Sequence, residues 1–192
     1  MPFDVVVVGG GPAGATTARQ LRQFGHEVCL LEAGTHPREK LCGGLLTRKT
    51  ARLLERVFAT DAETLLESAV IDHRSNRYEA FTGQSQLADQ TLDSSFYFAK
   101  RPAYDAYLFE QAHLSGATVR TGEPVVQVDH ETGTVRTASG RHYSGQYIVG
   151  ADGATSQVRQ CLSEADALTV PGWRDRLADR PSRPTSLDPA HR

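Results

Sequence analysis

The chain has 192 residues, a net charge of −2 and a pI near 6.4. It is long enough to bury a sizeable core, and its charge gives no electrostatic reason to expect nucleic-acid binding. No apolar stretch approaches the roughly 20 residues of a membrane-spanning helix, and we expect no signal peptide. Three cysteines and seven histidines show no disulfide or metal-ligand pattern, so we expect no metal site. These features predict a cytoplasmic protein, with peripheral membrane contact left open.

The first predicted element is a buried parallel strand at residues 5–8, where four valines follow one another. Gly9, Gly11 and Gly14 then give the spacing G-x-G-x-x-G, and a helix is predicted to begin near Ala13. In a dinucleotide site the first glycine permits a tight turn and the second lets the backbone approach a pyrophosphate. The third lets the helix pack close to the strand. The helix N-terminus adds N–H donors and a partial positive charge for the phosphates.

A second strand, residues 27–31, ends at Glu32, whose carboxylate can accept hydrogen bonds from ribose hydroxyls. Glutamate at this position, in place of arginine, disfavours a 2′-phosphate, so FAD or NAD is favoured over NADP. The alternative is an ordinary glycine turn without a ligand. Strand, glycines, helix, second strand and acid occur in order within 32 residues, which favours the nucleotide site.

The rest of the chain departs from simple β-α-β-α alternation, which disfavours an ordinary NAD-dependent dehydrogenase. Residues 35–46 are predicted as a loop and residues 47–58 as a helix that continues irregularly to Leu66. Short antiparallel strands are predicted at residues 69–73, 78–81 and 96–99. Further elements are a helix at 102–114, a strand at 118–120, a hairpin of 125–128 and 133–137, a strand at 147–151 and a helix at 155–162.

These elements predict an α/β fold of the Rossmann-like FAD-binding type, with three layers and a parallel sheet. Residues 1–162 form an FAD/NAD(P)-binding domain with inserted antiparallel strands at about 67–100. Residues 163–192 are rich in proline and charge and poor in large apolar side chains. That composition buries too little surface to offset its ordering entropy, so we predict a disordered tail.

Four segments together resemble the geranylgeranyl reductase family, within the wider group of FAD-dependent oxidoreductases that includes aromatic hydroxylases and flavin halogenases. They are residues 4–14, 36–45, 101–108 and 149–156. The resemblance extends from residue 3 to about 162. It implies FAD as cofactor and hydride transfer from reduced flavin to a prenyl double bond, with NAD(P)H or a ferredoxin-like protein as electron donor.

The resemblance also implies roles for residues outside the glycine loop. Arg101, at the start of its helix, faces the cofactor, where a guanidinium can bridge phosphate and ribityl oxygens; the alternative is a solvated surface arginine. Asp152 and Gly153 contact the cofactor, and Asp152 could also cap the following helix. The cofactor-binding residues expected from motif and resemblance are Gly9, Gly11, Pro12, Ala13, Gly14, Glu32, Ala33, Cys42, Gly43, Gly44, Arg101, Val125, Asp152 and Gly153.

Cys42 is the candidate catalytic residue, because the resemblance places it near the isoalloxazine ring. A thiol there could position substrate or exchange protons if its pKa were lowered. The paired glycines 43 and 44 let the backbone pass closely against a flat ring. The alternative is a small packed side chain without a chemical role.

The resemblance also implies parts that this sequence lacks. Such proteins run to about twice this length, with a larger substrate sheet and a later G-D-A element, and this chain contains no Gly-Asp pair. We therefore expect a chain truncated before the second half of the fold, acting on a small-molecule or prenyl-lipid substrate. The alternatives are a flavin monooxygenase or halogenase, and a non-catalytic nucleotide-binding fragment or a subunit completed by another chain.

Overall fold

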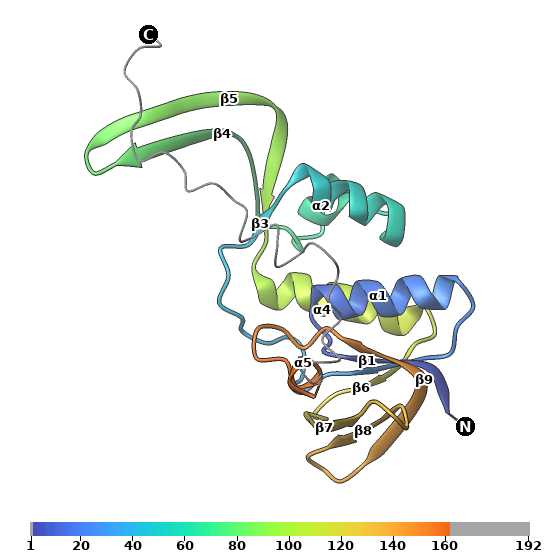
Figure 1. The fold of residues 1–192 in the computed structure, drawn as a ribbon. Helices are drawn as coiled ribbons and strands as arrows, with labels where there is room; N and C mark the ends of the chain where they lie inside the picture. The colour runs from blue at the N-terminus through green and yellow to red at the C-terminus, as the bar shows by residue number, and fades with distance from the viewer. Residues whose placement is uncertain (1, 162–192) are drawn as a thin grey trace, which may run out of the picture. The chain divides into compact units, whose positions relative to one another are not determined.

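The computed structural model describes residues 2–161, and the predicted disordered tail at 163–192 lies outside the described residues. Within them, six strands form one sheet in the order β6-β2-β1-β9-β8-β7 (Figure 1). The neighbours β6, β2, β1 and β9 pair in parallel, whereas β8 and β7 are antiparallel. The bounds are β1 (Phe3–Val8), β2 (Val28–Leu31), β6 (Thr118–Arg120), β7 (Val125–Asp129), β8 (Thr134–Thr137) and β9 (His142–Gly150).

The valines of β1 face two different layers, because successive side chains of a strand point to opposite sides. Val5 and Val7 pack in a core with the helices α1 (Pro12–Gln23) and α4 (Arg101–Leu114). Val6 and Val8 pack on the other side, with Val125 and Val135 of the β7–β8 hairpin. Figure 1 shows α1 and α4 side by side over the parallel strands. Helices, sheet and hairpin confirm the predicted three-layer α/β fold.

The first helix approaches the sheet closely because its inner face carries small residues. Ala15 and Ala18 are fully buried, and Pro12 lies in the first turn, where its missing N–H costs nothing. The predicted strand at 118–120, the hairpin of 125–137 and the helix from 102 to 114 are confirmed within a residue or two. The predicted strand at 147–151 is the end of the longer β9, and the last described helix is the short α5 (Gln157–Gln160).

The predicted helix at 47–58 is two elements, α2 (Arg48–Leu53) and a π-helical turn η1 (Leu54–Phe58). A π-turn shifts the i→i−4 hydrogen-bond pattern, and the Val57 carbonyl accepts from the side chains of Arg19 at 2.9 Å and Gln23 at 3.1 Å on α1. Helix α3 (Ala62–Glu67) follows, with Asp61 accepting from the Thr64 amide at its N-terminus. The hydrogen bonds from Arg19 and Gln23 hold the 47–67 segment against α1.

The inserted sheet contains β3 (Leu45–Leu46), β4 (His73–Thr82) and β5 (Ser85–Phe98) in the order β3-β5-β4. The predicted strand at 69–73 is wrong, because Ala69 lies in a turn with φ +58° and β4 begins only at His73. The segments predicted at 78–81 and 96–99 belong to much longer strands. Most side chains of this hairpin are exposed, so its sequence lacks the apolar alternation by which strands are recognised.

No helix among the described residues is both long enough and apolar enough to cross a membrane.

Candidate cofactor site

A cavity of about 390 Å³ opens at the carboxyl ends of β1, β2 and β9. This is where ligands bind in open α/β sheets. Ten of the fourteen predicted cofactor-binding residues line this cofactor cavity: Gly9, Gly11, Pro12, Ala13, Glu32, Ala33, Arg101, Val125, Asp152 and Gly153. Gly14 is buried behind the wall. Cys42, Gly43 and Gly44 lie outside this cavity, at two neighbouring hollows.

The glycines of the loop differ in how much space lies around the position that a Cβ atom would occupy. A Cβ on Gly14 would lie 1.8 Å from the Gly9 carbonyl oxygen, and one on Gly9 would lie 2.5 Å from the Ala151 oxygen. A Cβ on Gly10 would meet the Phe109 ring at 2.7 Å. A Cβ on Gly11 would meet only the Arg38 guanidinium, at 3.8 Å, and Gly11 has ordinary extended backbone angles. The protein itself does not need glycine at position 11, so the open space there is available to a ligand.

The electrostatic character of the cavity suits a diphosphate. No side chain among the described residues caps the N-terminus of α1, and its first turn carries no acid. The helix end therefore offers free backbone donors and a partial positive charge. Three cations, Arg38, Lys40 and Arg101, line the same cavity together with three carboxylates, Glu32, Glu123 and Asp152. The helix N-terminus, and not an excess of cations, is what fits the pyrophosphate of a dinucleotide.

Glu32 is held firmly at the end of β2. Its amide donates to the Arg120 carbonyl, and its own carbonyl accepts from the Glu123 amide. The carboxylate is 5% exposed and accepts from the Gly10 amide at 2.7 Å and the Gly34 amide at 3.0 Å. Burial alone would raise the pKa of Glu32, but these two amides and Arg38 bring the pKa below its usual value.

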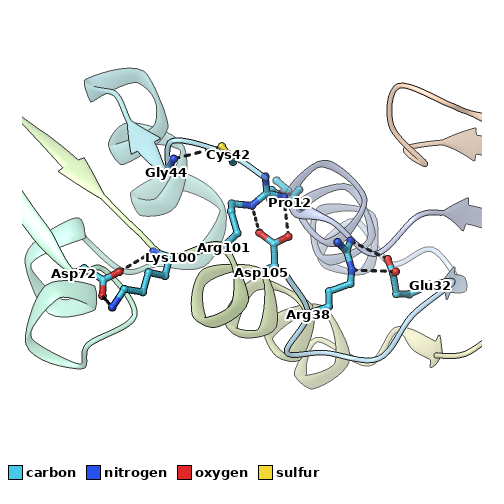
Figure 2. Close-up of polar contacts among 10 residues, drawn as sticks. Pro12, Glu32, Arg38, Cys42, Gly44, Asp72, Lys100, Arg101 and Asp105 are labelled. Atoms are coloured by element: carbon cyan, nitrogen blue, oxygen red, sulfur yellow. Dashed lines mark hydrogen bonds and ion pairs between the residues drawn. The ribbon is translucent and has the colours of Figure 1, made fainter. Parts of the chain in front are cut away.

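The Glu32 carboxylate also forms an ion pair with Arg38, whose Nε lies 3.2 Å from Oε1 (Figure 2). The hydrogen bond of this pair is donated by Arg38 Nη2 to Oε2 at 3.4 Å, whereas Nε has no hydrogen-bond partner among the described residues. The sequence predicts that Glu32 accepts from ribose hydroxyls. In the structure its oxygens already have partners, so a ribose would have to share them with Arg38 or displace it.

Arg101 is held at the edge shared by the cofactor cavity and the two neighbouring hollows. Its Nε and Nη2 donate to the fully buried Asp105 carboxylate at 2.6 and 2.7 Å (Figure 2). This bidentate pair raises the pKa of Arg101. The Arg101 side chain is only 19% exposed, so it is not a solvated surface arginine. A guanidinium has five N–H donors, and the remaining ones are available at the cavity edge.

Asp152 caps helix α5, as the helix-cap alternative predicts. Its Oδ1 accepts from the Ser156 hydroxyl at 2.6 Å, and its Oδ2 accepts from the Gln157 amide at 2.7 Å. Asp152 and Gly153 also form part of the cavity wall. Capping and lining the cavity are therefore combined in one residue.

Cys42 lies on the loop before β3 and is exposed. Its Sγ accepts a hydrogen bond from the Gly44 amide at 3.4 Å, and this bond and the nearby Arg101 guanidinium lower the pKa of the thiol (Figure 2). Together with Arg101, Cys42 borders a second, largely apolar cavity of about 440 Å³ between α1, α4 and the 44–58 segment. Leu45, Leu46 and Leu53 lie in its wall.

Sequence reasoning missed several residues of the cofactor cavity: Arg38, Lys40, Glu123, Pro124, Thr155 and Gln157. Arg38 and Lys40 lie inside the segment 36–45 that carries the family resemblance, so a signal for them was present. Glu123 is buried, forms an ion pair with Arg141 and accepts from the Ser139 hydroxyl at 2.7 Å. No motif marks Glu123, because tertiary contacts alone bring it to the cavity.

Comparison with known proteins identifies the family. The model of the "FAD binding domain" family matches residues 2–181, so the chain belongs to that family. Rifampicin monooxygenase of Streptomyces venezuelae is 32% identical over 169 residues, which are 85% of this chain and 34% of that protein. Geranylgeranyl diphosphate reductase of Rhodobacter capsulatus is also 32% identical, over 183 residues, which are 89% of this chain and 42% of that protein.

Solved structures share the fold. The tetrameric form of 2-methyl-3-hydroxypyridine-5-carboxylic acid oxygenase matches with a TM-score of 0.69 and 27% identity, over 81% of this chain and 41% of that one. A mutant of halogenase PltM in complex with FAD matches with a TM-score of 0.71 over 83% of this chain and 36% of that one; at 18% identity it shows the fold alone. The chain spans about a third to two fifths of the length of these proteins.

Proposed function

We propose that the cofactor cavity binds the ADP half of FAD and that the chain functions as an FAD-dependent oxidoreductase. Gly11 carries this proposal, because its open side-chain position beside an uncapped helix N-terminus has no structural explanation within the protein. The backbone at Gly11 and Ala13 would hold the pyrophosphate, with Arg38 and Lys40 beside it. Glu32 and Ala33 would hold the adenosine ribose.

The residues at the second cavity support a reaction on an apolar substrate. FAD, when bound, supplies hydride transfer. Pro12, Ala13 and Arg101 border both cavities, so a ligand spanning them would pass the Arg101 guanidinium. Arg101, fixed by Asp105, would orient this ligand by hydrogen bonds. Cys42, the candidate catalytic residue, would place its thiol at the same edge. The leucines of the wall exclude water and suit a hydrocarbon chain.

We infer from this apolar wall that the substrate class is a prenyl chain whose double bond is reduced, with NAD(P)H as the electron donor. The geranylgeranyl diphosphate reductase of Rhodobacter capsulatus supports this assignment. A monooxygenase is the second candidate, because rifampicin monooxygenase shows the same identity over a similar share of the chain. The two candidates differ in the product: reduction adds hydrogen to a double bond, whereas monooxygenation adds one oxygen atom.

Thermal unfolding with nucleotide fragments tests the cofactor assignment. ADP and FAD are expected to raise the melting temperature of the purified chain, and FMN, which lacks the ADP half, is expected to leave it unchanged. A ligand at a hundredfold its dissociation constant adds about 2.7 kcal/mol to stability, which is readily measured. Stabilisation by FMN equal to that by ADP would contradict the assignment.

Mass spectrometry of products tests the reaction. Protein loaded with FAD and given NADPH would be incubated with geranylgeranyl diphosphate under nitrogen and, separately, with rifampicin in air. Gain of hydrogen by the prenyl compound supports the reductase. Gain of oxygen by rifampicin, without reduction of the prenyl compound, supports the monooxygenase.

A further inference from the structure

Four exposed cations on α2 and η1 have no ion-pair or hydrogen-bond partner within the described part of the chain, residues 2–161. Arg48, Lys49, Arg52 and Arg56 are all exposed, and together they define the basic face of α2 and η1. Within residues 2–161, none of the four side chains makes an ion pair or hydrogen bond. Residues 40–56 contain five cations and a single carboxylate, Glu55, although the whole chain has a net charge of −2.

Two other exposed arginines do have carboxylate partners. Arg74 pairs with Glu63 at 2.8 Å and Arg77 pairs with Asp89 at 2.7 Å. Lys40, Arg120 and Arg159 are also exposed without a carboxylate partner among the described residues, but they lie on separate segments of the chain. The basic face gathers four such cations on adjoining turns, so its field extends into solvent and is available to an external anion.

The arrangement on the helix separates charge from the core. Arg48, Lys49 and Arg52 fall within an arc of about 100° at the helical repeat. Leu54, Val57 and Phe58 of the following turn are buried against the protein. Figure 1 shows α2 beyond α1 and α4 as seen from the parallel strands, so the sheet does not cover it.

Exposed apolar side chains precede this face in the chain. Leu41, on the loop before β3, is fully exposed, and Leu45 of β3 is 51% exposed. Leu45 also forms part of the wall of the second cavity, together with Thr50 and Leu53 of α2. Cationic side chains beside exposed leucines form the combination that binds anionic bilayers, where the charges attract head groups and the apolar groups insert.

We propose that the basic face, with Leu41 and Leu45, docks on an anionic lipid surface and presents the second cavity to the bilayer. Each Lys or Arg near such a surface contributes about 1 kcal/mol of attraction, so four of them suffice for reversible binding. The proposal deepens the proposed function by naming the source of an apolar substrate. Docking itself requires no flavin, so it stands or fails separately from cofactor binding.

Vesicle sedimentation tests the proposal with the full chain of 192 residues. We expect binding to vesicles of phosphatidylcholine with about 30% phosphatidylglycerol, none to pure phosphatidylcholine, and a loss of binding as salt rises from about 0.1 M to 0.5 M. The variant Arg48→Gln/Lys49→Gln/Arg52→Gln/Arg56→Gln should bind at least about tenfold more weakly. ADP should stabilise this variant as it does the wild type.

A matched control removes the same charge elsewhere. Arg74→Gln/Arg77→Gln/Arg120→Gln/Arg159→Gln also replaces four exposed cations and should bind vesicles as the wild type does. Leu41→Ser should lower the binding that persists at high salt. Equal losses in the two quadruple variants, absence of vesicle binding by the wild type, or binding of duplex DNA instead of vesicles would overturn the proposal.

Discussion

Single residues of the glycine loop serve two separate purposes. Gly9, Gly10 and Gly14 are required because a Cβ on any of them would lie less than 3.0 Å from other protein atoms. Gly11 has no such constraint, and its side-chain position faces the cofactor cavity. The spacing G-x-G-x-x-G therefore combines glycines needed for packing with one that keeps space for a ligand.

Substitution of Gly11 separates these purposes. Gly11→Val should reduce nucleotide binding by at least about tenfold, because the added methyl groups occupy the space a pyrophosphate needs, while stability falls by only about 1 kcal/mol from the poorer helix cap. Isothermal titration with ADP and urea denaturation measure the two effects. Gly14→Ala is the contrasting variant and should not fold stably, because its Cβ meets backbone. Wild-type ADP affinity in Gly11→Val would rule out this site.

Glu32 predicts a pH dependence of stability. Folding lowers the pKa of this carboxylate, so its contribution is present above the unfolded value near 4.5 and is lost as pH falls towards the folded value. Melting temperatures of the wild type and Glu32→Gln should therefore differ at about pH 6, and the difference should shrink as the pH falls below about 4.5. A difference that stays constant over this range would show that the carboxylate charge is not what stabilises the fold.

The sequence predicted those site residues that belong to local motifs. Glu32 is predicted because it follows a strand at the expected distance, and Arg101 because it opens a helix in a segment that carries the family resemblance; both lie at the cofactor cavity. The partners that set their chemistry were missed. Arg38 reaches Glu32 from six residues away, and Glu123 reaches the cavity only through the pairing of residues 120–123 with the end of β2. Arg38 lies in the segment 36–45 that carries the family resemblance, but no spacing in the sequence indicates that it pairs with Glu32, and no motif indicates Glu123.

The strands of this fold differ in how much pairing and packing stabilises them. β1 is paired on both edges and covered on both faces. The β4–β5 hairpin is exposed over most of its length, and the short β3 pairs with it only at its base, Leu45 with Phe98 and Leu46 with Tyr97. A two-stranded ribbon is marginally stable in water without packing on a face. Arg77 with Asp89 is one of the few side-chain contacts across it.

Hydrogen exchange should reveal this difference. Amides at 77–91 in the hairpin should exchange far faster than those of residues 5–8, because local opening of the ribbon breaks few apolar contacts. Mass spectrometry of peptides after exchange measures both regions in one sample. Equal protection of the two regions would mean that the ribbon is covered in solution by another surface.

The elements predicted correctly are those with a buried face. The alternation or runs of apolar residues in β1, α4 and the β7–β8 hairpin result from burial. These elements can therefore be predicted from the sequence. Only residues 78–81 and 96–98 of the β4–β5 hairpin are predicted as strand, because its exposed remainder needs no apolar pattern. The π-turn at 54–58 was also missed, because its geometry depends on Arg19 and Gln23 of another helix.

At the scale of the described molecule, the cofactor cavity is assembled from segments far apart in the chain. Its wall combines the loop after β1, the end of β2, the 38–40 loop, residues 123–125 and residues 151–157. A ligand that contacts all of them must order them together. Ligand binding would therefore couple the segments that follow β1, β2 and β9.

Binding of ADP should consequently slow amide exchange in these segments at once. We expect protection to rise at residues 9–14, 32–34 and 151–157 and to stay unchanged in the 77–91 ribbon, which does not line the cavity. Exchange with and without saturating ADP measures this. Protection confined to residues 9–14 would show that the nucleotide binds the loop alone.

Because β1 lies in the middle of the sheet, it cannot complete its pairing early during synthesis on the ribosome. One edge of β1 awaits β9, whose residues emerge more than a hundred residues later. Translation at about 5–20 residues per second leaves that edge unpaired for many seconds. During this time the valine-rich strand is exposed, and chaperones can bind it. A nucleotide can contact the whole cofactor cavity only after residue 157 has left the exit tunnel.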